Sequence, residues 1–155
     1  MLRIAFIVQG EGRGHMTQAL ALCTMLTDLG HDVVAAFIGT SDERPRPPRF
    51  FMEDIGCEVF TYDAPTFVQD KNSRGVRMGA TLWQNALKSG RYIKSVRRLH
   101  DQLTALKPDL ILSFYELITG LYTTLHTPPA PVVSVGHQYF LQHSSFVYPD
   151  GSTWN

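Results

Sequence analysis

The sequence is poor in the features that mark secreted and membrane-spanning proteins. It has two cysteines, Cys23 and Cys57, which are too few for a disulfide framework. We expect both to be buried thiols in a reducing cytoplasm. No apolar run approaches the roughly 20 residues that cross a bilayer. The residues after Met1 lead straight into a short apolar stretch instead of a signal peptide, so a cytoplasmic protein is expected.

Acidic residues are missing from one long stretch of the chain, although the formal net charge is zero. The zero balance disfavours a general nucleic-acid binder. Residues 71–100 contain 8 lysines and arginines and no aspartate or glutamate. They form either an ordinary solvated face or a contact with an anionic acceptor or a negatively charged membrane surface. On a predicted long helix, the basic residues beside the apolar stripe are Lys88, Arg91, Lys94 and Arg98.

Apolar runs and amphipathic segments alternate along the 155 residues. This alternation predicts a Rossmann-like, doubly wound α/β domain with a parallel sheet over the whole chain. One helix end is marked by Gly30, and the longest helix is expected to bend at Gly90. Strands are expected at 2–8, 32–38, 57–62, 109–114 and 132–135, and helices at 16–29, 50–55, 81–106 and 116–126.

The first predicted strand and helix are joined by the sequence Gly-Glu-Gly-Arg-Gly-His over residues 10–15. A strand, a glycine turn and a helix N-terminus form an anion site, because glycine lets the backbone approach a ligand and the helix offers free N–H groups. The turn departs from the dinucleotide fingerprint, since His15 stands in place of its third glycine and no acid ends the second strand. There is no Walker pattern either. A nicotinamide or flavin cofactor and a P-loop nucleotidase are both disfavoured.

His15 is the first candidate for a chemical role. A helix N-terminus disfavours protonation of histidine, which leaves a neutral imidazole available as a base; the alternative is a histidine that only orders the turn. Ligands in doubly wound folds bind beyond the carboxyl ends of the strands. Polar residues also follow the fourth and fifth strands, where Glu116 either binds substrate or stabilises a helix N-terminus and His137 either contacts ligand or supports a loop. No set of residues indicates a metal site.

Three segments in order resemble the N-terminal domain of GT-B fold glycosyltransferases. The likeness is to bacterial and archaeal members related to MurG and to the galactolipid synthases, and it extends from residue 2 to about residue 141. The glycine turn with its histidine is moderately specific, and the combination of segments is stronger. The segments read GEGRGHMTQALAL and LGHDVVAA over residues 10–36, KPDLILSFYE over 107–116 and PVVSVGHQ over 131–138.

This resemblance implies a glycosyltransferase whose N-terminal domain binds the acceptor, while a C-terminal domain or partner subunit holds the nucleotide-sugar donor. The expected reaction moves the sugar to a hydroxyl of a glycan or lipid-linked acceptor, without a metal or other cofactor. Since the chain stops at Asn155, it is either a fragment or half of a split enzyme. Alternatives are a non-catalytic recruiting subunit and a nucleotide-sugar epimerase or hydrolase. The implied roles are base for His15 and substrate contact for Gly10, Gly12, Arg13, Gly14, Glu116, His137 and Gln138.

Overall fold

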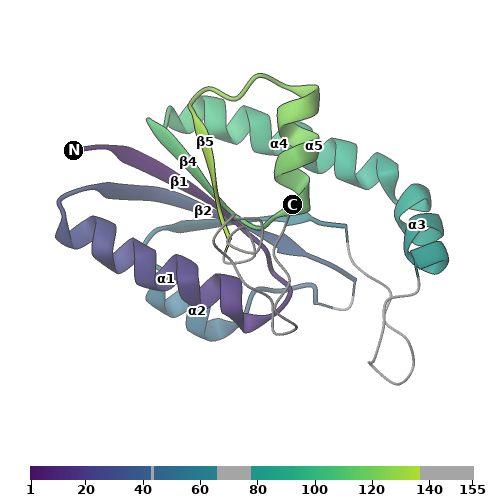
Figure 1. Cartoon of the computed structure of the whole chain (residues 1–155), viewed down its shortest axis with the longest axis horizontal. Helices are drawn as coiled ribbons and strands as arrows, with labels where there is room; N and C mark the ends of the chain where they lie inside the picture. Colours follow the sequence, from purple (N-terminus) through teal and green to yellow (C-terminus); the bar gives the residue numbers. More distant parts are fainter. Residues whose placement is uncertain (43, 66–77, 137–155) are drawn as a thin grey trace, which may run out of the picture.

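A single parallel sheet organises the computed structural model, which describes residues 1–42, 44–65 and 78–136. The strand order in the five-stranded sheet is β3-β2-β1-β4-β5 (Figure 1). The Rossmann-like parallel architecture predicted from the sequence is therefore confirmed. The strands are β1 (Arg3–Val8), β2 (Asp32–Thr40), β3 (Glu58–Asp63), β4 (Leu110–Phe114) and β5 (Val132–Val135).

Helices cover both faces of the sheet (Figure 1). On one face lie α1 (Arg13–Asp28) and α2 (Arg49–Asp54), and on the other lie α4 (Ser89–Leu106) and α5 (Leu117–Leu125). A further helix, α3 (Met78–Leu87), is set away from the strands at the beginning of α4 (Figure 1). The central strand β1 is apolar from Ile4 to Val8 because both of its faces are covered.

Two helix boundaries differ from the sequence prediction. First, α1 begins at Arg13, so that Gly14 and His15 lie in its first turn and Gly12 is its N-cap. Second, the single helix expected over residues 81–106 is wrong, as is its bend at Gly90. The chain forms α3 and α4, and the break falls at Lys88, whose φ of −94° and ψ of 2° leave the helical range.

The predicted end of the first helix at Gly30 is confirmed. Gly30 has a φ of 80°, and its N–H donates to the carbonyl oxygen of Thr27. The N–H of His31 donates to Leu26 at 2.9 Å, which completes a Schellman motif. This tight stop returns the chain directly into β2.

The winding direction of the chain reverses between β1 and β4. From β1 the chain builds β2 and β3 on one side, and it then crosses to build β4 and β5 on the other. Val8 pairs with Phe114 in the parallel register, and the N–H of Gln9 donates to the carbonyl oxygen of Phe114 at 3.4 Å. Ligands bind such folds at this reversal, beyond the carboxyl ends of the strands. The segments that follow β1 and β4 therefore face one crevice.

Candidate functional site

The glycine turn after β1 presents the start of α1 to this crevice. Gly12 adopts a φ of 82° and a ψ of 152°, a conformation that is essentially restricted to glycine. Gly12, as the N-cap, has no side chain to accept from the first N–H groups, and the first turn of α1 contains no acidic residue. Arg13 and Gly14 are exposed. The N–H groups and the positive end of the α1 dipole are thus available to an anion.

His15 meets the segment after β4. Its imidazole stacks on the ring of Tyr115, with the ring centroids 5.5 Å apart and the planes inclined by 12°. Tyr115 is 44% exposed and has a left-handed backbone φ of 52°. The sequence gave no reason to pair Tyr115 with His15, because 100 positions separate them. The shared edge of the sheet brings them together.

Glu116 is a buried carboxyl group at the same edge. It is 7% exposed, and its Oε1 accepts a hydrogen bond from the N–H of Ile118 at 3.3 Å, so it caps α5. Burial raises the pKa of Glu116, the N–H groups of α5 and the Tyr62 hydroxyl lower it, and the charge of Glu11 raises it slightly, so that the resulting pKa is about 7. Of the two roles that the sequence left open for Glu116, the structure shows the stabilisation of a helix N-terminus, and the contact with substrate stays a prediction. A carboxyl group that titrates near neutral pH can also accept or give up a proton.

Two cavities meet at Glu116. The smaller, of about 10 Å³, is large enough for about one water molecule and lies among the ends of β1, β2 and β3. Its lining includes Gly10, Glu11, Gly39 and Arg44. The larger is a cleft of about 540 Å³ beside α5. Hydroxyl groups dominate its polar lining, which is drawn from Ser113, Tyr115, Thr119, Thr123 and Ser134.

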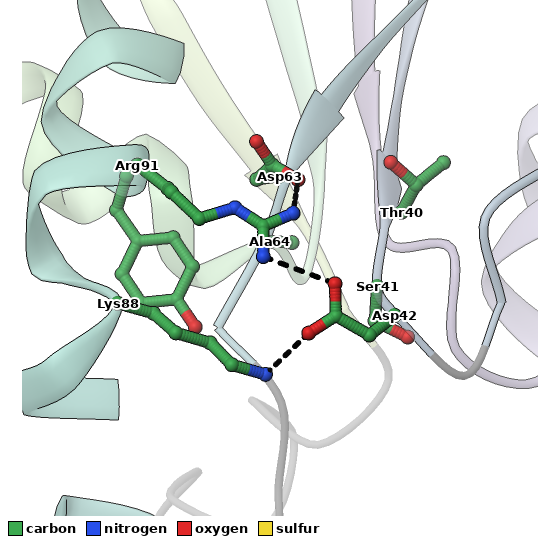
Figure 2. Close-up of a pocket in the computed structure, with 8 residues that line it drawn as sticks. Thr40, Ser41, Asp42, Asp63, Ala64, Lys88 and Arg91 are labelled. Atoms are coloured by element: carbon green, nitrogen blue, oxygen red, sulfur yellow. Dashed lines mark hydrogen bonds and ion pairs between the residues drawn. The ribbon is translucent and has the colours of Figure 1, made fainter. Parts of the chain in front are cut away.

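A network of charged side chains lies next to the smaller cavity (Figure 2). The Arg91 guanidinium donates to Oδ1 of Asp42 at 3.0 Å and to Oδ1 of Asp63 at 2.8 Å. The Lys88 ammonium is 2.8 Å from Oδ2 of Asp42. These cations hold the pKa of Asp42 below its ordinary value. Two cations of the acid-free stretch are therefore paired with acids from elsewhere in the chain, which leaves them less available to an external anion.

The remaining predicted residues are placed as follows. Arg13 is exposed, and its guanidinium lies 4.8 Å over the centre of the Phe50 ring. His137 and Gln138, together with Lys71, Arg74 and Arg77, lie outside the described residues. Across the described ranges, no group of three or more His, Cys, Asp or Glu side chains is arranged to hold a metal ion. No described helix has the length and apolar character needed to cross a membrane.

Solved structures share this fold. CalG4, the calicheamicin glycosyltransferase, matches with a TM-score of 0.50 and 19% identity over 88% of this chain and 33% of its own. MurG from Acinetobacter baumannii matches with a TM-score of 0.51 and 15% identity over 86% of this chain and 35% of its own. The chain thus spans about a third of the length of these two proteins. At these identities the likeness establishes the fold.

No curated protein matches the sequence. The family model described as glycosyl transferase family 1 matches residues 2–152, which is nearly the whole chain. This match confirms the resemblance that the three sequence segments predicted. The chain belongs to glycosyl transferase family 1.

Proposed function

We propose that this chain is the acceptor-side domain of a glycosyltransferase that moves a sugar from a nucleotide-sugar donor to a hydroxyl acceptor. One observation carries the proposal: the glycine-capped N-terminus of α1, His15 and Glu116 meet at the crevice where the winding of the chain reverses. A helix N-terminus suits the diphosphate of such a donor. The hydroxyl-lined cleft beside α5 suits a glycan acceptor, whose own hydroxyls can exchange hydrogen bonds with it.

In the proposed reaction the acceptor oxygen attacks the anomeric carbon of the donor sugar, and the bond from that carbon to the donor phosphate breaks. His15 takes the proton of the acceptor hydroxyl as general base. The free N–H groups of α1 stabilise the negative charge that grows on the departing diphosphate. The proposal uses no metal and no other cofactor, since the helix supplies positive potential where the leaving group develops charge.

The donor-binding half of the site is proposed to lie in a second domain or in a partner subunit. Support comes from the length relation, because the chain spans 33% and 35% of the two glycosyltransferases that share its fold. The mass of the protein as its source cell makes it tests this point. A mass of twice 17.4 kDa or more is expected for a two-domain enzyme, whereas 17.4 kDa directs the search to a partner subunit.

The test of the reaction uses the whole protein, incubated with a panel of nucleotide sugars and hydroxyl acceptors. Product mass separates glycosyl transfer from release of the free sugar and from epimerisation of the donor. His15→Ala is expected to lower kcat at least about a hundredfold. The matched control is His31→Ala, which removes a half-buried histidine just before β2, at the opposite edge of the sheet. A loss under about threefold for His15→Ala, with the fold intact, removes His15 as the base.

An anionic membrane surface is the second proposed partner, and α3 and α4 support it. Trp83 and Leu87 are 69% and 71% exposed on α3, which is set away from the strands (Figure 1). Lys94, Arg97 and Arg98 are exposed on α4, and none has an ion-pair partner among the described residues. Exposed aromatic and aliphatic side chains next to cations are typical of helices that lie on a membrane surface.

Co-sedimentation with phosphatidylserine vesicles tests this contact. Exchange of Arg97 and Arg98 for glutamate is expected to release the protein from the vesicles, and binding by the wild type is expected to weaken with added salt. The control exchanges Arg46 and Arg49 for glutamate, which changes the net charge by the same amount. Both residues are exposed, Arg46 before α2 and Arg49 at its start, and α2 covers the opposite face of the sheet from α4. Equal effects of the two variants would contradict a defined contact. Vesicle binding without any transfer activity would favour a recruiting subunit.

A further inference from the structure

We propose that Tyr115 is a positioning residue that fixes the orientation of the His15 imidazole. The inference rests on the proposed function only in assigning a task to His15; the contact between the two rings is independent of it. The ring centroids are 5.5 Å apart with an interplanar angle of 12°. This distance and near-parallel orientation are those of a stacked aromatic pair.

The surroundings of His15 explain why such a contact is useful. His15 lies in the first turn of α1 between Gly12, the N-cap with a φ of 82°, and the body of the helix. Gly14 precedes His15. A β-carbon placed on Gly14 would have no atom within 4 Å apart from its chain neighbours and the backbone of its own helix. Gly12 and Gly14 contribute no side chain that could hold the imidazole, whereas the Tyr115 ring stacks directly on it.

The backbone at Tyr115 is organised to deliver that ring. Its φ of 52° lies in the left-handed region, which non-glycine residues seldom adopt. The other non-glycine residue with a positive φ in the described ranges is Lys107, which ends α4, where this conformation is ordinary. Tyr115 ends no helix. Strained backbone of this kind persists where the surrounding structure requires it, commonly at functional sites.

The side chains on either side of Tyr115 show what the conformation achieves. Phe114 is fully buried in the core and Glu116 is 7% exposed, whereas Tyr115 between them is 44% exposed. The left-handed turn thus keeps Glu116 inside as the cap of α5 while the Tyr115 ring comes out against His15. Glycine or asparagine would adopt this conformation at less cost, but neither would provide an aromatic face.

The first experiment measures the contact by NMR on the chain itself, without reference to activity. Tyr115→Phe keeps the ring, and Tyr115→Asn removes the ring while tolerating the left-handed backbone. Wild type and Tyr115→Phe are expected to show cross-relaxation between the ring protons of residue 115 and of His15. In Tyr115→Asn the ring protons of His15 are expected to move downfield as the ring current disappears. Unchanged His15 shifts in a folded Tyr115→Asn variant would overturn the proposal.

The second experiment measures the consequence in the whole protein. Tyr115→Asn is expected to lower kcat by about ten- to a hundredfold, and Tyr115→Phe, which keeps the ring, to restore most of that loss, while the cost of its missing hydroxyl appears in the acceptor KM. In a His15→Ala background, Tyr115→Asn is expected to cause no further loss, because a positioning residue acts through the group it positions. Independent, multiplying losses would overturn the proposal. If His15→Ala alone leaves transfer intact, the proposed base fails while the NMR result still decides the contact.

Discussion

The backbone of Gly10 packs directly against the carbonyl oxygen of Gly39, so that a β-carbon on Gly10 would collide with it. Gly39 is equally confined, since its own β-carbon would stand 2.9 Å from Cβ of Ala64 and 3.1 Å from Oε2 of Glu116. The ends of β1 and β2 therefore meet through two glycines directly beside the buried carboxyl group. The glycine turn contains a structural glycine and, at Gly14, one whose surroundings are open.

This difference separates stability from ligand binding. Gly10→Ala is expected to lower the free energy of unfolding by about 1 to 3 kcal/mol, because the collision is with backbone atoms that have little room to move. Gly14→Ala is expected to keep or raise stability by up to about 1 kcal/mol, since alanine favours helix. In the whole protein, Gly14→Ala is nevertheless expected to weaken donor binding if a diphosphate approaches the start of α1. Urea unfolding and donor titration measure the two effects, and equal stability losses would contradict the packing argument.

Glu116 is expected to make stability fall as the pH rises from about 4.5 to about 7. Its pKa of about 7 in the folded chain lies above the ordinary value of 4.5, so the folded state holds the proton that the unfolded state has released. The contribution is fully present below about pH 4.5 and is lost as the pH passes through 7, and it amounts to about 3 kcal/mol.

Urea unfolding at a series of pH values measures this effect as the difference between wild type and Glu116→Gln. The glutamine amide oxygen can still accept from the Ile118 N–H, so the cap of α5 is kept while the titration is removed. Glu53→Gln, at an exposed carboxylate of α2, is the control that changes the net charge equally. Parallel curves for wild type and Glu116→Gln would show that the carboxyl group is not perturbed.

Lys107→Gly is expected to stabilise the domain by about 1 kcal/mol. Lys107 ends α4 with a φ of 49°, and its N–H donates to the carbonyl oxygen of Leu103. A β-carbon is unfavourable in this left-handed conformation, and glycine removes that cost at the expense of a more flexible unfolded chain. Lys107→Ala is the matched control, because it deletes the side chain but keeps the β-carbon. A similar gain in both variants would assign the effect to charge instead of backbone.

Asp42→Asn is expected to speed amide hydrogen exchange at Ser41 and Arg44 without changing global stability. These residues exchange backbone hydrogen bonds of 3.0 and 3.1 Å, in a segment that Asp42 ties to α4. The pairs are exposed, so their loss opens the segment locally. About 1 M salt should reproduce part of the effect in the wild type. Glu53→Gln, which breaks an exposed pair within α2, should leave these amides unchanged.

The sequence predicted most of the fold because the strands and helix ends of this domain follow from short, local sequence patterns. A strand covered on both faces is continuously apolar, as Ile4 to Val8 shows, and the end of α1 follows from Gly30. The placement of the glycine turn beside Glu116 also followed, because parallel strands bring their carboxyl ends to one edge.

What the sequence missed depends on partners that are far apart along the chain. The break at Lys88 accompanies an ion pair with Asp42, and the stack of His15 on Tyr115 joins positions 100 residues apart. Neither leaves a periodic signal. The raised pKa of Glu116 results from burial by several elements at once, and the residues next to Glu116 in the sequence do not indicate it. The acid-free stretch was also misleading as a measure of available charge, since Asp42, after β2, and Asp63, at the end of β3, pair with its cations.

The charged network connects α3 and α4 to the smaller cavity of the crevice. Thr40 and Ser41 line both the smaller cavity and the pocket in which Arg91 and Lys88 hold Asp42 (Figure 2). Tyr92, one residue beyond Arg91, donates its hydroxyl hydrogen to Asn85 of α3 at 2.9 Å. A continuous series of side-chain contacts therefore links α3, through the start of α4, to residues that line the smaller cavity beside Glu116.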